Sequence, residues 1–295
     1  MVRRRSIEAA LGILADAVLG EPPLSPHPVS AFGRIMRHVE RRLHRDHRGA
    51  GIVHAAAGAG IGSVAGAVLR STAAATYLAV AGRALGEAAQ DVGTALSAGD
   101  LARARTLLPA LVGRDPSTLD EKEIARAVVE SVAENTVDAV VAPALWGAVL
   151  GAPGALGYRA VNTLDSMVGH RNERYIRYGW ASARLDDLAN LGPARVTALL
   201  VAAVRPSAAG AVWSSVRRDA AGHPSPNSGV AEAAFAAALG LRLGGENRYG
   251  DRVEVRPSLG DGRPAEADDI ARAVALLQHV ALALAGALTV HGVVG

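Results

Sequence analysis

Residues 130–190 read ESVAENTVDAVVAPALWGAVLGAPGALGYRAVNTLDSMVGHRNERYIRYGWASARLDDLAN. Polar clusters rich in carboxylates and amides stand at both ends of this stretch. Between them, the run from Ala139 to Tyr158 carries no charged side chain, and its length suits one membrane crossing. Pro143 and Pro153 interrupt the run, which membrane helices tolerate where they line protein or a cavity. The stretch predicts a helix in a membrane with polar, chemically active ends.

Four other apolar runs lie on either side of this one. They cover residues 7–20, 52–81, 196–216 and 273–294, and the first and third are the weaker candidates for membrane spans. The run 273–294 is the strongest, because only Gln278, His279 and His291 interrupt its apolar side chains. We therefore expect an all-α fold: a polytopic integral membrane helical bundle over residues 1–295, a single membrane-embedded domain with helical polar loops. Its expected location is the cell (inner, cytoplasmic) membrane, crossed several times.

Two local patterns refine this expectation. Gly58, Gly62 and Gly66 repeat at a spacing of four, which lets two helices approach closely. Residues 244–264 alternate apolar and charged side chains around GDG, which predicts one short hairpin. A buried alanine- and glycine-rich helix of a soluble protein is the alternative for residues 52–81.

The composition excludes several kinds of site. The chain has no cysteine, so it has neither disulfides nor thiolate metal sites. Its formal net charge is only +3, and Lys122 is its only lysine. Aromatic residues, which stack on bases, make up only 3% of the chain, so we expect no nucleic-acid partner.

The first polar cluster places three carboxylates at intervals of four residues. On a continuous helix, Glu130, Glu134 and Asp138 share one face. Like charges at this spacing repel each other, so the arrangement does not stabilise the helix by itself. A metal ion, or a substrate carrying a positive charge, would explain it.

The second polar cluster combines carboxylates, amides and arginines. Hard oxygen ligands hold Mg²⁺ and guanidinium groups hold phosphate oxygens, so the combination is typical of a magnesium–phosphate site. Its members are Asn162, Asp165, Arg171, Asn172, Glu173, Arg174, Asp186 and Asp187. Structural roles compete with this interpretation: Arg184 and Asp187 could form a helix ion pair, and Asn162 and Asp165 could cap a helix.

Two proline-rich loops add candidates. His27 lies between Pro26 and Pro28, and it is either part of an ordered turn or a site histidine. The loop AGHPSPNSG, residues 221–229, holds His223, Asn227 and Ser228 and leads into a helix. Backbone N–H groups at a helix N-terminus bind anions, although most such loops serve only as caps.

Several stretches resemble a known family. They are DAVLGEPPLSPHPVSAFGRIM, ESVAENTVDAVVAP, the block from APGALGYRAVNTLDSMVGHRNERYIRYGWASARLDDLAN to LGPARVTALL, and GHPSPNSGVAEAAFAAALGLRLGG. They are similar to the cobalamin-biosynthesis membrane proteins called CbiB or CobD, adenosylcobinamide-phosphate synthases. The resemblance covers nearly the whole chain and is weakest over residues 50–110. It implies an integral membrane enzyme that joins a carboxyl of the corrinoid cobyric acid to aminopropanol or aminopropanol phosphate, driven by ATP with Mg²⁺.

The candidate residues can be given roles in that reaction. We expect Glu130, Glu134 and Asp165 to be catalytic, with His27 or His223 accepting a proton from the attacking amine. We expect Asp138, Asp186 and Asp187 to hold Mg²⁺. The expected substrate- and phosphate-binding residues are Asn135, Asn162, Arg171, Asn172, Arg174, Arg184, Asn227 and Ser228. The sequence contains no GxxxxGK[ST] phosphate-binding loop, so it does not identify the nucleotide pocket.

Two other classes of function compete with the ligase. Carboxylates beside Gly- and Pro-interrupted membrane helices are also typical of transporters. A non-catalytic scaffold that gathers other corrinoid enzymes, or further copies of this chain, at the membrane is the second alternative. The expected partners are therefore the corrinoid and aminopropanol substrates, the lipid bilayer, and other enzymes of the pathway or a second copy.

Overall fold

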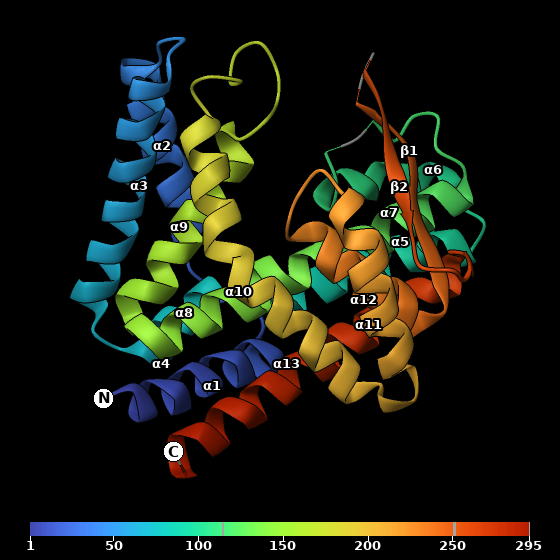
Figure 1. The fold of residues 1–295 in the computed structure, drawn as a ribbon. Helices are drawn as coiled ribbons and strands as arrows, with labels where there is room; N and C mark the ends of the chain where they lie inside the picture. The colour runs from blue at the N-terminus through green and yellow to red at the C-terminus, as the bar shows by residue number, and fades with distance from the viewer. Residues whose placement is uncertain (114, 250–251, 295) are drawn as a thin grey trace. The chain divides into compact units, whose positions relative to one another are not determined.

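A computed structural model describes residues 1–113, 115–249 and 252–294 (Figure 1). The chain forms two compact units, whereas the sequence predicts a single domain. Unit 1 comprises Met1–Ala81, Asp138–Leu191 and Leu284–Gly295, and unit 2 comprises Gly82–Val137 and Gly192–Ala283. Both units are built almost entirely of helices, as the sequence predicts.

Unit 1 is a bundle of helices. Its elements are α1 (Val2–Leu19), α2 (Pro28–Leu43), α3 (Arg48–Leu69), α4 (Thr72–Ala79), the π-helical turn η2 (Val137–Val141), α8 (Ala142–Leu150), α9 (Ala152–Val168) and the first part of α10 (Trp180–Val204). The last residues of α13 (Ala267–Val294) also belong to it.

Glycines bring α3 and α9 close together in this bundle, where the two helices lie side by side (Figure 1). A Cβ atom added at Gly62 would lie 2.5 Å from the Cβ of Ala160 and 2.6 Å from the carbonyl oxygen of Leu156. Gly58 faces the side chain of Leu164 in the same way, and Gly66 faces the backbone of Ala152. The glycine repeat therefore forms a helix–helix contact, as its spacing predicts.

We expect Gly62→Ala to lower the free energy of unfolding by about 1–3 kcal/mol, because the added methyl group has no room against α9. Gly60→Ala on the same helix is the matched control, since nothing lies within 4 Å of a Cβ at that position. Thermal and urea unfolding in detergent should separate the two variants. Equal stability of the two would show that α3 and α9 are not held at the distance described.

Within the part of the chain that the structure describes, three helices are long and apolar enough to cross a membrane: α3, α10 and α13. The predicted run 273–294 lies inside α13. The predicted run 7–20 falls in α1 apart from its last residue, and each of the other three predicted spans contains a break. Residues 52–81 break after α3, where Arg70 adopts a left-handed conformation with φ 62° and Ser71 caps α4. Residues 139–158 break at Gly151, whose φ is 76°, and residues 196–216 break at Arg205.

Unit 2 packs helices against a small sheet. Its elements are α5 (Gly82–Ser97), α6 (Leu101–Leu107), η1 (Leu108–Ala110), α7 (Glu121–Thr136), η3 (Pro206–Ala208), α11 (Ala209–Asp219), η4 (Ala220–Gly222), α12 (Ser228–Leu239), β1 (Leu241–Tyr249), β2 (Arg252–Leu259) and β3 (Arg263–Pro264), with the rest of α10 and α13. Asp120 and Glu123 form the capping box that starts α7.

The hairpin exists but begins and ends earlier than the sequence predicts. β1 and β2 pair antiparallel from Leu243 with Leu259 to Tyr249 with Arg252. GDG, residues 260–262, lies after this hairpin, and β3 then pairs parallel with β1. Asp219 accepts a hydrogen bond from the Gly260 N–H at 3.0 Å, which ties the end of β2 to α11.

Candidate functional site

Unit 1 gathers polar side chains from three helical segments around Asn190. The amide nitrogen of Asn190 donates to the Oδ1 of Asp138 at 3.0 Å and to the Oδ2 of Asp186 at 3.0 Å. Its amide oxygen accepts from the hydroxyl of Tyr158 at 2.8 Å. Asn162 donates to the other oxygen of Asp186 at 3.3 Å. One amide therefore holds two carboxylates together, and we name these five residues the Asn190 cluster.

The π-helical turn explains the position of Asp138. The sequence predicts that Asp138 continues the face of Glu130 and Glu134, but α7 ends at Thr136 and residues 137–141 form a π-helical turn. Such a turn inserts one extra residue into a helix, and single π-turns occur often at functional sites. Asp138 accordingly faces Tyr158, from which it lies 3.3 Å, and Asn190.

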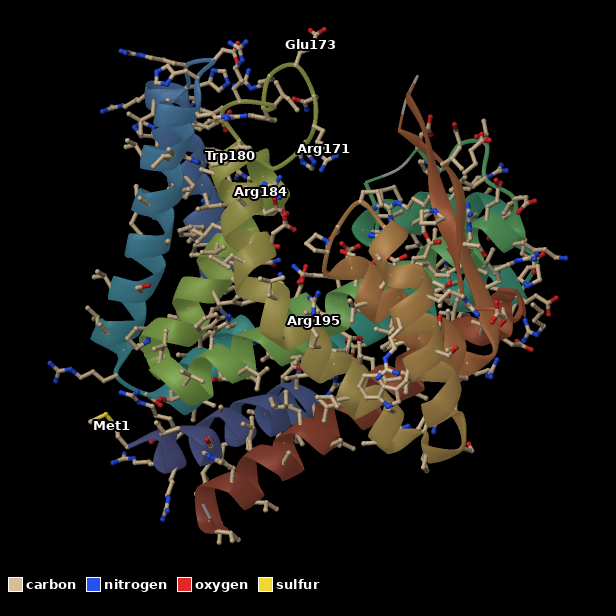
Figure 2. All side chains as sticks on the ribbon, in the orientation of Figure 1. Met1, Arg171, Glu173, Trp180, Arg184 and Arg195 are labelled. Carbon is tan, nitrogen blue, oxygen red and sulfur yellow. The ribbon has the colours of Figure 1, made fainter. Side chains whose placement is uncertain are left out.

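Asp187 does not join this cluster through the contacts described. Its carboxylate lies 3.7 Å from the guanidinium of Arg184, one turn earlier on α10. Figure 2 shows Arg184 on α10 and Arg171 on the segment between α9 and α10. The charge of Arg171 also acts on Asp187. Asp187 thus interacts with two arginines, Arg184 and Arg171, and in the chain it directly follows Asp186 of the Asn190 cluster.

A tryptophan supports the helix that carries Asn190. Pro193 lies inside α10 and has no N–H group to donate to the carbonyl of Ala189, four residues earlier. The indole N–H of Trp146 donates to that carbonyl instead, at 3.1 Å. The substitute hydrogen bond fixes α10 to α8 one residue before Asn190.

Unit 2 holds a second group of candidate residues around a cavity of about 120 Å³. Glu130, Ser131, Glu134 and Arg256 line it, together with residues 111–113. Glu134 accepts a hydrogen bond of 2.7 Å from the hydroxyl of Ser228, and Glu130 accepts one of 2.9 Å from the N–H of Gly244. The two glutamates thus share a face, as their spacing predicts, and Arg256 provides a positive charge beside them.

A buried histidine and glutamate lie behind this cavity. The Nε2 of His223 is 3.6 Å from a carboxylate oxygen of Glu232, and Arg256 is 3.8 Å from the same oxygen. The N–H of Ser225 donates to the Nδ1 of His223 at 3.1 Å. Burial, and then the charge of Arg256, lower the pKa of His223 below its usual value. His223 is therefore neutral near pH 7, with both ring nitrogens facing protein groups.

The remaining predicted residues lie in other local structures. Arg174 pairs with the buried Glu40 at 3.0 Å. Asn172 accepts from the N–H of Tyr175 and so caps a turn, and Asn135 donates within α7 to Ser131. Asn227 accepts from Arg195 at 2.8 Å. Two predicted catalytic residues lie in unit 1: His27 precedes α2 as its N-cap residue, and Asp165 lies on α9 one turn after Asn162.

The donor set of the Asn190 cluster fits a magnesium ion that is also bound by phosphates. Among the described residues, no group of three or more histidine and acidic side chains is arranged to hold a metal by itself. Mg²⁺ in nucleotide sites is commonly held by only one or two carboxylates, with phosphates and water completing its shell. Asp138 and Asp186 would supply two carboxylates, whose negative charges a divalent cation would balance.

Sequence reasoning missed Asn190, Tyr158, Glu232 and Arg256. Asn190 follows Asp186 by four residues, so helical spacing could have joined it to the cluster. Glu232 is a lone carboxylate in a helix of small apolar residues, and a buried charge in such a helix needs a partner. Nothing in the local sequence signals Tyr158 or Arg256, because their neighbours come from distant segments.

Comparisons with known proteins agree with one another. A family model described as CobD/Cbib protein matches residues 9–277. "Cobalamin biosynthesis protein CobD" of Mycobacterium tuberculosis (strain ATCC 25618 / H37Rv) is 47% identical over 289 residues, which cover 94% of this chain and 92% of the relative. The protein of that name from Geobacter metallireducens is 46% identical over 269 residues, covering 84% of each chain. The one from Chromobacterium violaceum is 41% identical over 305 residues, covering 96% and 97%. No solved structure matches the chain.

Proposed function

The chain belongs to the CobD/CbiB family of cobalamin biosynthesis proteins, and from this we propose that it is an amide ligase. The proposed reaction joins aminopropanol or aminopropanol phosphate to the carboxyl of (adenosyl)cobyric acid at the expense of ATP. The product is (adenosyl)cobinamide or its phosphate. We also propose that the chain crosses the cytoplasmic membrane several times, which the three long apolar helices support.

The chemistry requires activation of the carboxylate, because its oxygen is a poor leaving group. In the proposed reaction a carboxylate oxygen attacks the γ-phosphorus of ATP, and the bond to ADP breaks. The amine then attacks the carbonyl carbon of the acyl phosphate, inorganic phosphate leaves, and the amine gives up a proton. When bound, Mg²⁺ would neutralise phosphate oxygens during this transfer.

The observation that carries the proposal is the convergence of Asp138 and Asp186 on one amide. We assign these two carboxylates to Mg²⁺ and assign Asn162 and Asn190 to the orientation of the carboxylates. Removing a residue that orients a metal-binding carboxylate commonly lowers metal affinity or activity by about 10- to 100-fold. We assign Arg171 and Arg184, whose positive charges both act on Asp187, to the nucleotide phosphates.

We assign the cavity of unit 2 to the amine substrate. Two carboxylates, Glu130 and Glu134, suit an ammonium group, and the guanidinium of Arg256 suits a phosphate. The cavity therefore favours a small molecule that carries both charges, and so the phosphorylated amine over the free one. His27 and His223 are both candidates for proton acceptor; the Nδ1 of His223 accepts from Ser225, and its Nε2 lies 3.6 Å from Glu232.

The test is a reaction with detergent-solubilised protein, adenosylcobyric acid, Mg²⁺ and ATP, with either aminopropanol or its phosphate. Mass spectrometry should detect the amide and equal amounts of ADP and phosphate, and the amide should vanish without ATP. We expect the phosphorylated amine to react at lower concentration. Absence of product from folded protein with both amines would overturn the ligase and favour the transporter or the scaffold.

A further inference from the structure

An apolar pocket of about 280 Å³ lies within unit 1, and none of the five residues of the Asn190 cluster lines it. Helix α2 contributes Phe32 and Ile35, α3 contributes Ile61 and Ala65, and α9 contributes Leu156 and Arg159. The proposed reaction gives this pocket no role. Its size and its walls suit a segment of hydrocarbon chain.

Of the described residues that line the pocket, Arg159 is the one with a charged side chain. Its Nε atom is buried and has no hydrogen-bond partner. The charges of Asp138 and Glu21 act on Arg159, so its positive charge is partly balanced within the protein. A buried guanidinium N–H without an acceptor is costly, and an anionic oxygen bound to the guanidinium of Arg159 would balance its positive charge.

The rim of the pocket is apolar and exposed. Ile35 is 50% exposed and Ile61 is 39% exposed. Helix α3 is long and apolar enough to cross a membrane, and it also exposes Ile52, Val53 and Val68 along its length. Exposed apolar side chains along a candidate span are what a lipid-facing helix presents. A ligand can therefore enter this pocket from the lipid bilayer.

The depth of Arg159 suits a lipid headgroup. The neighbouring Ala160 packs against Gly62, and α3 ends seven residues later at Leu69. At about 1.5 Å per residue this is roughly 10 Å from the end of the helix. An arginine at such a depth can extend toward the interface while its stem stays among apolar side chains.

We propose that this pocket binds one acyl chain of an anionic phospholipid, whose headgroup phosphate accepts a charge-assisted hydrogen bond from Arg159. The apolar walls exclude a free inorganic anion as the natural ligand. The positive charge of Arg159 favours an anionic lipid over hydrocarbon or a neutral detergent. The lipid would act as a structural ligand between α2, α3 and α9, independently of the proposed amide ligation.

Native mass spectrometry can test this with protein exchanged into an equal mixture of phosphatidylglycerol and phosphatidylcholine. We expect the wild type to retain one phosphatidylglycerol in preference to phosphatidylcholine. Arg159→Gln should weaken phosphatidylglycerol binding by about tenfold or more, which is the loss of one hydrogen bond to a charged group. Ala65→Phe should remove the bound lipid by filling the pocket, while keeping Arg159.

Matched controls distinguish this site from general lipid affinity. Ala67→Phe places the same ring on α3 away from the pocket, and Arg34→Gln removes an exposed arginine that does not line it. Both should retain the lipid as the wild type does. Far-UV circular dichroism and gel filtration verify that each variant is folded. Arg159→Gln tests the contact with the headgroup, and Ala65→Phe tests the apolar pocket. No retained lipid in the wild type, unchanged retention in both pocket variants, or displacement by inorganic phosphate or cobyric acid would overturn the proposal.

Discussion

Asp186→Asn is expected to lower the turnover of amide formation by roughly 10²–10³-fold, because it removes one of the two carboxylates assigned to Mg²⁺. The carboxamide keeps the size of the side chain and can still accept one hydrogen bond from Asn190 or Asn162. The change therefore removes charge with little effect on packing. A plot of rate against Mg²⁺ concentration should shift to higher concentration, whereas the KM for the amine should change little.

Asp187→Asn is the matched control, since it makes the same chemical change at the next residue. Asp187 faces Arg184 at 3.7 Å, and the Arg184 side chain is 66% exposed. Asp187, whose side chain is 31% exposed, is not assigned to Mg²⁺ and pairs with a largely exposed partner, so we expect Asp187→Asn to change turnover by a factor of about five or less. Equal losses in the two variants, or Asp186→Asn protein with full turnover, would contradict the assignment of Mg²⁺ to the Asn190 cluster.

Glu232→Ala is expected to lower the free energy of unfolding by about 3–5 kcal/mol, the usual loss when one partner of a buried ion pair is removed. Glu232 is fully buried on α12, between His223 and Arg256. Without it, the positive charge of Arg256 would face a cavity in the core of unit 2. Urea unfolding in detergent, followed by circular dichroism, measures the loss.

A double variant shows whether the charge causes that loss. Arg256→Met in the Glu232→Ala protein removes the stranded cation, so it should recover part of the stability. Glu266→Ala is the surface control: its carboxylate is 57% exposed and 3.8 Å from Arg263, and we expect a change within about 0.5 kcal/mol. If Glu232→Ala unfolds at the same urea concentration as Glu266→Ala, the buried ion pair does not hold unit 2 together.

The helical fold was predictable because apolar runs and glycine spacing are local properties of the chain. The α3–α9 contact follows from three glycines four residues apart, and α13 contains the strongest apolar run. The breaks were less predictable. Arg70 ends a helix in a left-handed conformation that disfavours side chains other than glycine, so no residue type marks that position. Gly151 could have marked the other break, because it adopts a positive φ.

The sequence predicted which residue types form the candidate site, but it did not predict which of these residues contact one another. Asp138 and Asp186 were both expected at a metal, yet the sequence placed Asp138 with Glu130 and Glu134 because a regular helical period was assumed. The π-helical turn changes that phase, and its hydrogen bonding depends on how Val137–Val141 packs. Arg174 was expected at a phosphate, but its partner Glu40 is 134 residues away, a pairing that spacing along one helix cannot indicate.

The π-helical turn also makes residues 137–141 unusual in their response to insertions and deletions. The same chain segment supplies Glu130 and Glu134 to unit 2 and Asp138 to unit 1. Removing one residue from this turn would restore a regular α-helix, and the start of α8 would rotate by about 100° relative to the end of α7. No single substitution has that effect. Length variation in this family should therefore fall in surface loops, and the number of residues between Glu134 and Pro143 should be fixed.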